Sequence, residues 1–396
     1  MTAGARAPAA PVTLYQLSDD PYPALARLRA SAPVCWFEEI GMWMVTRRED
    51  VVAVLRDPER FTTEHPRSPI GDIFGRQMLS LDGDPQKRVK AACILPFSKR
   101  EVAERWRSVV EAKVDRLILA LEWRGAADLR RTVSGPLSVA SVGAVLGIPE
   151  EFHPTVLEWY ERFSRALANF TADPEARIQG QVAASEFRLA MRPLLERAAR
   201  DPSGGLFATL VHAADRLSDE EILSNALIIL FGGIETTDAT IANTVWALLT
   251  HPDALAWARS TEGGWAAVVE ESLRWEPAVQ SCTRYAKAGV TLAGVQIAAG
   301  DAIQCMIGAA NRDPAHFDDP DRFDVRRVNA GDHLSFGIGR HLCLGAHLAR
   351  EEAIATLPKL FERLDGLRLD PERPTRPAGY EFRKPPELPV RWKPRR

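Results

Sequence analysis

The chain has 396 residues, of which 46% are hydrophobic and 26% are charged, a balance typical of a globular protein and unlike that of disordered or fibrous chains. A net charge of −3 argues against nucleic acid as a partner. No apolar run approaches the roughly 20 residues that a helix needs to cross a bilayer, so we expect no membrane anchor. The five cysteines are scattered, which argues against a disulfide framework and fits a reducing cytoplasm.

In chain order, residues 1–12 are rich in Ala and Pro and predict a flexible tail, and residues 13–396 are expected to form one domain. Val, Trp, Phe and Ile in Pro33–Thr46, with a turn at Gly41, predict a small hairpin. Apolar residues at three- and four-residue spacing then predict helices over Arg100–Arg124, Pro154–Ala168, Arg177–Arg200 and Ser218–Leu249. Strands are expected within Val290–Gln304 and Leu388–Trp392. The predicted fold is mainly α with a minor β part.

The longest predicted helix begins at a capping box, because Ser218 is followed three residues later by Glu221. It carries Gly232 and Gly233 near its middle, and each glycine costs about 1 kcal/mol relative to alanine. Two explanations are open at this point. The glycines either allow close packing against another helix or leave backbone exposed to a flat ligand.

The most specific pattern is F-x-x-G-x-x-x-C-x-G, which runs from Phe336 to Gly345 and contains Cys343. Its glycines allow main-chain amides to approach a sulfur anion, and a helix is expected to start near Leu344 with its positive end toward that sulfur. A thiolate is the form of cysteine that ligates metal, and an axial thiolate on haem iron favours O–O cleavage. The segment resembles the cysteine-ligand loop of the cytochrome P450 superfamily, which makes Cys343 the expected axial ligand of haem b.

Three further segments fit the same resemblance. Glu271–Arg274 is similar to the family's E-x-x-R helix and Pro320–Phe323 to its P-x-R-F segment. The resemblance implies a buried triad of Glu271, Arg274 and Arg322. Gly232–Thr237 is similar to the oxygen-binding part of the family's long helix. The implied fold is a single triangular domain whose long central helix lies over the haem.

The resemblance also implies roles for individual residues. Arg284 and His341 are expected to bind the haem propionates, and Gly233 and Phe336 to lie against the haem. Gln86 and Lys90 stand where most relatives have His and Arg, and both keep a hydrogen-bond donor.

The catalytic residues implied by the resemblance are Thr236, facing the oxygen pocket, and Glu235, relaying protons from solvent. Adjacent helical residues do not share a face, which is why the two are assigned different roles. The alternative for Thr236 is a hydrogen bond back to a carbonyl one turn earlier.

Substrate contacts are expected from Phe74, Ile228, Phe231 and Gln280, which would form a mostly apolar pocket. For the apolar residues of this set the alternative is ordinary core packing.

The activity implied is insertion of one oxygen atom from O2 into a small apolar organic substrate of secondary-metabolite, terpenoid, steroid or fatty-acid type. Electrons would come from NAD(P)H through a separate ferredoxin and ferredoxin reductase. Lys99, Arg100, Arg105, Arg107 and Arg340 would form a basic patch for that ferredoxin, or else a solvated helix face. The rival functions are a peroxide-driven or otherwise unusual haem-thiolate enzyme and a haem-binding sensor without turnover.

Overall fold

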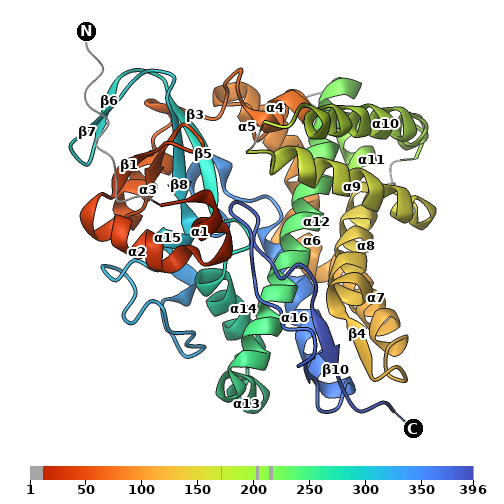
Figure 1. Cartoon of the computed structure of the whole chain (residues 1–396). Coiled ribbons are helices and arrows are strands. Elements are labelled where there is room, and N and C mark those ends of the chain that lie inside the picture. The colour runs from red at the N-terminus through yellow and green to blue at the C-terminus, as the bar shows by residue number, and fades with distance from the viewer. Residues whose placement is uncertain (1–11, 171, 202–204, 214–216, 396) are drawn as a thin grey trace.

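The computed structural model describes residues 12–170, 172–201, 205–213 and 217–395 (Figure 1). The expected tail over residues 1–12 lies outside the described residues except for Val12, which packs against a small apolar cluster that includes Leu17 and Leu25.

Up to residue 211 the chain contains short helices followed by the long helices of one side of the molecule. These helices are α1 (Leu14–Asp19), α2 (Pro21–Ser31), α3 (Arg48–Arg56), α4 (Pro69–Phe74), α5 (Gly83–Cys93), α6 (Lys99–Glu101), α7 (Arg107–Leu119), α8 (Gly135–Leu146), α9 (His153–Leu167), α10 (Pro174–Ala198) and α11 (Gly205–Val211). The second half contributes α12 (Asp219–Thr250), α13 (Pro252–Ser260), α14 (Gly264–Trp275), α15 (Ile307–Ala310) and α16 (Ala346–Arg363).

In the described part of the chain, ten strands form three sheets. They are β1 (Val34–Phe37), β2 (Met42–Val45), β3 (Phe61–Thr62), β4 (Ala126–Asp128), β5 (Ser281–Ala286), β6 (Val290–Leu292), β7 (Val295–Ile297), β8 (Ala302–Met306), β9 (Arg368–Leu369) and β10 (Pro389–Arg391). The largest sheet has the order β1-β2-β8-β5-β3, and the other two are β4-β10-β9 and β6-β7. In the largest sheet β5 runs antiparallel to β8. The first half of the chain contributes the hairpin β1–β2 at one edge of this sheet and the short strand β3 at the other edge.

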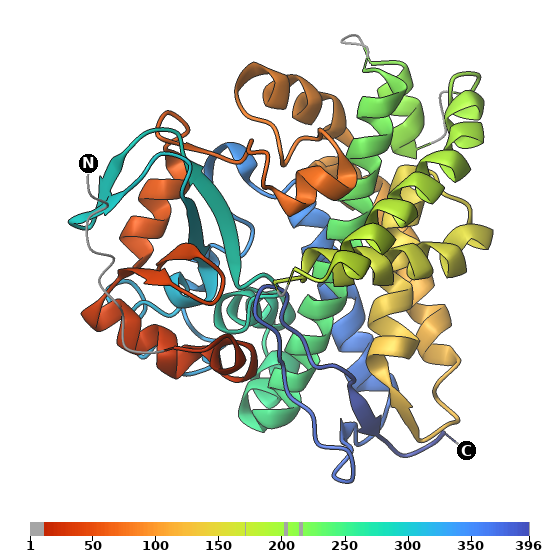
Figure 2. The same ribbon diagram turned by 45° about the horizontal axis from the view of Figure 1, so that its top comes forward.

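The helix α12 organises the molecule. Its first turn is closed by the predicted capping box, in which the Ser218 hydroxyl accepts from the Glu221 amide at 3.2 Å and the Glu221 carboxylate accepts from the Ser218 amide at 2.9 Å. It packs against α8, α14 and α16. Figures 1 and 2 show it between the sheet-rich part, with α1–α3, and the helices α7–α10. Among the described residues α12 is the single helix long and apolar enough to cross a membrane, but most of it is buried inside the protein, as expected of a core helix.

Most predicted elements are confirmed, including the hairpin with Gly41 in a positive-φ turn and the helices α9, α10 and α12. The helix predicted over Arg100–Arg124 is shorter and irregular. It starts at α6 and passes through a wide π-turn at Val102–Trp106 before α7. In that turn the amide of Arg107 donates to the Val102 carbonyl five residues earlier, and the Trp106 indole donates to Pro96 at 2.8 Å. Periodicity alone does not reveal such a bulge.

The predicted triad is right for Glu271 and Arg274 and wrong for its third member. Arg274 donates two hydrogen bonds of 2.7 Å to Glu271, and both side chains are fully buried. The third member is Arg327, whose guanidinium lies 3.4 Å from Glu271 and also donates to the carbonyls of Asp318 and Asp319. The expectation for Arg322 is wrong, because its side chain is exposed and only its carbonyl oxygen enters the cluster, accepting from Arg274 at 3.1 Å.

We therefore expect Arg327→Ala to lower the free energy of unfolding by about 1–3 kcal/mol, since it removes charged hydrogen bonds from a buried carboxylate and two carbonyls. Arg322→Ala, the matched control, should change it by less than about 0.5 kcal/mol, as surface substitutions usually do. Denaturant unfolding followed by circular dichroism measures both. Equal losses in the two variants would contradict the assignment of Arg327.

Candidate active site

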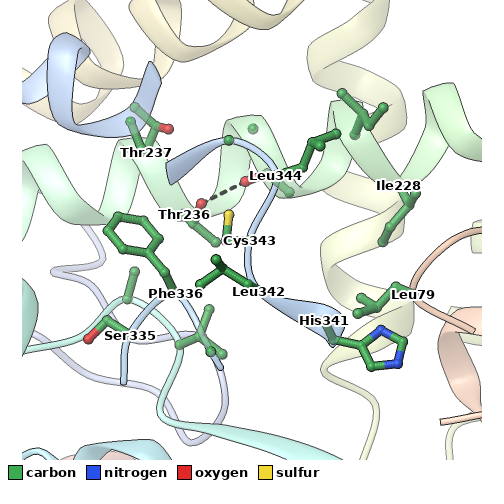
Figure 3. Close-up of a pocket in the computed structure, with 18 of the residues that line it drawn as sticks. Leu79, Ile228, Thr236, Thr237, Ser335, Phe336, His341, Leu342, Cys343 and Leu344 are labelled. Atoms are coloured by element: carbon green, nitrogen blue, oxygen red, sulfur yellow. Dashed lines mark hydrogen bonds between the residues drawn. The ribbon is translucent and has the colours of Figure 1, made fainter. Parts of the chain in front are cut away.

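A cavity of about 310 Å³ lies beside α12, where the sheet-rich and helical parts meet. Figure 3 shows side chains from α12 and from the segment before α16 facing the same space. The lining residues come from elements far apart in the sequence and include Leu79, Gln86, Lys90, Val142, Ile228, Gly232, Thr236, Val279, Cys282, Arg284, Phe336, His341, Cys343 and Glu352.

Cys343 sits in a tight segment, Phe336–Gly345, which we call the ligand loop. The amide of Cys343 donates to the Phe336 carbonyl at 2.8 Å and closes the loop. Gly337 and Gly339 both have positive φ, and a Cβ at Gly339 would lie 3.0 Å from the Leu55 carbonyl oxygen, so glycine is required there. The loop therefore holds the cysteine at a fixed position in the cavity wall.

The surroundings of the Cys343 sulfur act on its charge in two directions. Burial raises the pKa of the thiol, whereas a hydrogen bond from the Gly345 amide and the positive charges of Lys90 and Arg350 lower it. The Arg350 guanidinium also lies 4.4 Å from the centroid of the Phe336 ring and so fixes that ring beside the loop. The Cys343 side chain itself is exposed to the cavity, so its sulfur is open to a ligand bound there.

Gln86 and Lys90 reach the site differently from the expectation. Lys90 donates to the carbonyls of Arg340 at 2.7 Å and Leu342 at 2.8 Å, and Gln86 donates to Arg340 at 3.1 Å. Both side chains line the cavity, but their hydrogen bonds hold the backbone of the ligand loop.

Arg284 and His341 both line the cavity. Arg284 is only 7% exposed, yet it pairs with no carboxylate of the described residues and donates a hydrogen bond to the Thr283 carbonyl at 2.8 Å. His341 lies 3.0 Å from the Asp82 carboxylate. Burial lowers the pKa of His341, and the hydrogen bond to Asp82 opposes that shift. A buried guanidinium without an anion indicates that an anionic ligand group belongs here.

The two explanations for the glycines of α12 each apply to one residue: helix packing explains Gly233, and exposed backbone explains Gly232. A Cβ at Gly233 would lie 2.8 Å from a methyl group of Val142 in α8, so Gly233 allows close helix packing. A Cβ at Gly232 would meet nothing within 4 Å, so the backbone there is open to the cavity. Both line the cavity, but Gly232, and not the expected Gly233, is the glycine that leaves room for a ligand.

Thr236 and Glu235 point to different sides of α12, as predicted. Thr236 lines the cavity, and its hydroxyl donates to the Gly232 carbonyl at 2.6 Å (Figure 3). The two possibilities considered for Thr236 therefore coexist, because this back-bond leaves the oxygen's lone pairs facing the cavity.

Glu235 is 1% exposed and belongs to a charged cluster on the far side of α12. Its carboxylate is 2.6 Å from the Lys384 ammonium and accepts hydrogen bonds from Ser164 at 3.0 Å and from the Tyr160 hydroxyl. Lys384 also lies 3.3 Å from Asp238. Glu235 is thus neutralised by a lysine of the C-terminal segment and does not line the cavity.

The sequence interpretation missed Glu352, which lies on α16 and lines the cavity. The carboxyl group accepts from the Thr237 hydroxyl at 3.3 Å, and burial raises its pKa to about 8. It forms no ion pair with any described residue, and its burial therefore favours the protonated form. The signal in the sequence was an acid on the otherwise apolar face of the helix after Cys343.

The expected substrate residues divide in the same way. Ile228 lines the cavity. Phe74 and Phe231 instead pack together with ring centroids 5.8 Å apart in an aromatic cluster of the core. Gln280 is 1% exposed and turns away, donating to Pro277 at 2.9 Å and to the Tyr22 hydroxyl at 3.2 Å. For Phe74 and Phe231 the core-packing alternative describes the structure, and Gln280, like them, does not line the cavity.

The residues present fit a haem. Cys343 offers one sulfur ligand, Arg284 a buried cation for a propionate, and Gly232 an open stretch of backbone on the facing helix. No cluster of three or more His, Cys, Asp or Glu side chains able to hold a bare metal ion is found among the described residues. A single cysteine suits a metal whose other ligands come from a macrocycle.

Comparison with known proteins agrees with this geometry. The family model described as "Cytochrome P450" matches residues 265–386. The cytochrome P450 monooxygenase PikC of Streptomyces venezuelae is 36% identical over 94% of this chain and 91% of its own length. Nocardicin C N-oxygenase of Nocardia uniformis subsp. tsuyamanensis is also 36% identical, over 94% of this chain and 96% of its own.

Among solved structures, P450BioI in complex with acyl carrier protein ligated to hexadec-9Z-enoic acid superposes with a TM-score of 0.89 at 29% identity. That match covers 96% of this chain and 100% of the other. The chain is a monooxygenase of the cytochrome P450 superfamily.

Proposed function

We propose that this monooxygenase inserts one oxygen atom from O2 into a small, mainly apolar organic substrate bound between Ile228 and the ligand loop. The observation that carries the proposal is that Cys343 and Thr236 line the same cavity. When bound, the haem iron supplies O2 binding and the oxidising chemistry. The protein residues bind and orient the haem, exclude water and deliver protons.

Haem binding is assigned to residues with distinct tasks. Cys343 would ligate the haem iron, Arg284 and His341 would bind the propionates, and Phe336 would pack against the porphyrin. Gln86 and Lys90 act indirectly, since their hydrogen bonds to Arg340 and Leu342 keep the ligand loop in place.

Proton delivery is assigned to Thr236, Glu235 and Glu352. The Thr236 hydroxyl donates its proton to the Gly232 carbonyl, so its lone pairs can accept a hydrogen bond from a water and hold that water in the cavity. Glu352 offers a second proton source within the cavity, because its carboxyl carries a proton near neutral pH. Glu235 forms an ion pair with Lys384. We therefore propose that protons reach Glu235 from solvent through Lys384.

The substrate class is inferred from the lining and the relatives. Leu79, Ile228, Ile229 and Val279 make much of the wall apolar. Relatives include a mycinamicin IV hydroxylase/epoxidase, and a structural neighbour was solved with myristic acid. We therefore propose a secondary metabolite or a fatty-acid-like compound, with terpenoids and steroids as the other apolar classes.

Electrons are proposed to come from NAD(P)H through a ferredoxin reductase and a ferredoxin, in the cytoplasm. Ile94 and Leu95 are 49% and 59% exposed just after α5, the helix whose Lys90 holds the ligand loop. Lys99 is exposed beside them and forms no ion pair with a described residue, whereas Arg100 and Arg107 are paired with Glu104 and Glu351. An exposed apolar spot flanked by a free lysine suits an acidic partner.

We propose that residues 13–396 form one functional domain, because α12 contacts elements of both parts of the molecule.

Arg284→Gln should weaken haem binding about tenfold or more, because it removes a charged hydrogen-bond donor from a buried propionate site. Arg284→Lys, the matched control, keeps the charge and should lose less. Haem transfer to apomyoglobin measures retention in each variant. Unchanged transfer rates in Arg284→Gln would contradict the propionate assignment.

Thr236→Val tests the oxygen chemistry. The near-isosteric variant should retain haem and substrate binding, but product formed per NAD(P)H consumed should fall about tenfold or more as hydrogen peroxide is released instead. Thr250→Val is the matched control, because its hydroxyl makes the same kind of hydrogen bond to a carbonyl four residues earlier in α12 but does not line the cavity. Unchanged coupling in Thr236→Val would favour the peroxide-driven alternative, and absence of turnover in the wild-type protein with every partner tried would favour the sensor.

A further inference from the structure

Two cysteines that play no part in haem ligation lie side by side in the largest sheet. Cys282 of β5 and Cys305 of β8 are directly opposite each other in the antiparallel register. Opposite residues of such a pair have Cα atoms about 4.5–5.5 Å apart, a separation that disulfides span. Both thiols are free in the structure.

The two thiols differ in access. Cys282 is partly exposed, and it lines the cavity that contains the Cys343 sulfur and Thr236. Cys305 is fully buried behind it in the sheet core. A small oxidant in the cavity therefore meets Cys282 first, with Cys305 as its neighbour on the protein side.

The surroundings also make the two thiols chemically unequal. A hydrogen bond from the Cys305 thiol lowers the pKa of Cys282, although burial opposes the shift, and the positive charge of Arg284 lowers it further. The same hydrogen bond, in which Cys305 is the donor, raises the pKa of Cys305 together with burial. Burial also raises the pKa of the nearby Glu381 carboxyl to about 8, so that group is neutral at pH 7 and does not repel a thiolate. Cys282 is thus the better nucleophile of the pair.

We propose that Cys282 and Cys305 form a peroxide-sensitive thiol pair in the wall of the haem cavity, and that peroxide converts this pair reversibly to a disulfide. In the first step the Cys282 thiolate attacks one oxygen of hydrogen peroxide. The S–O bond forms, the O–O bond breaks, and the departing hydroxide takes up a proton to become water.

In the second step the sulfur of Cys305 attacks the Cys282 sulfenic acid. The S–S bond forms, the S–O bond breaks, and the hydroxide that leaves takes the Cys305 proton as a second water. Two thiols are oxidised to one disulfide while one peroxide is reduced to two waters. Peroxide released by an uncoupled oxygenase turnover would arise in this same cavity.

The test adds hydrogen peroxide directly to the haem-loaded protein, so its outcome does not depend on the proposed oxygenase reaction. Samples are quenched in acid, alkylated, and digested with trypsin without reductant. The two cysteines lie in separate tryptic peptides, Trp275–Arg284 and Ala288–Arg312, so a disulfide is seen by mass spectrometry as one linked species. We expect this species to form before Cys35 and Cys93 react, because burial raises the pKa of both those isolated thiols, and to disappear after dithiothreitol.

Single variants separate the two steps. Cys305→Ser should yield no linked peptide but a Cys282 sulfenic acid that dimedone captures. Cys282→Ser should leave Cys305 a free thiol under the same exposure. Recovery of both wild-type cysteines as alkylated thiols, a linkage of Cys282 to Cys343 instead, or equally fast loss of the Cys305 thiol in Cys282→Ser would each overturn the proposal.

Discussion

The rest of the site depends on holding the Cys343 sulfur at one place in the cavity wall, where a ligand can reach it. Desolvation raises the pKa of Cys343, and the Gly345 amide, Lys90 and Arg350 oppose that shift and so favour the anion. Lys90 serves twice, since its ammonium also binds two carbonyls of the ligand loop. The loop conformation and the charge of its cysteine are therefore stabilised by the same residue, and loss of either would affect the other.

The cavity opposite that sulfur is shaped by helix packing. Gly233 lets α8 approach α12 at Val142, and the neighbouring Gly232 leaves an open stretch of backbone facing the ligand loop. Thr236 is one turn further on the same side, while Glu235 is turned toward Lys384. One helix thereby separates the cavity that contains Cys343 from a charged cluster formed by Glu235, Asp238 and Lys384.

Features carried by local sequence were predictable: the loop around Cys343, the capping box at Ser218 and the opposite faces of Glu235 and Thr236. Features set by tertiary contacts were not. Arg327 replaces Arg322 beside Glu271 because the intervening loop turns back on itself. Phe74 and Phe231 meet each other rather than the cavity, and nothing in an apolar pattern distinguishes those two fates. Glu352 was missed because an acid that directly follows two charged residues on a helix usually faces water.

The claim that Cys343 is the axial thiolate is tested most directly by the absorption spectrum of the reduced carbon monoxide complex. The wild-type protein should show the band of thiolate ligation, and Cys343→Ser should lack it, because a hydroxyl is a harder and less donating ligand. Cys93→Ser, which changes an isolated buried thiol, is the matched control and should keep the band. Retention of the thiolate band in Cys343→Ser, or its loss in Cys93→Ser with haem still bound, would contradict the account.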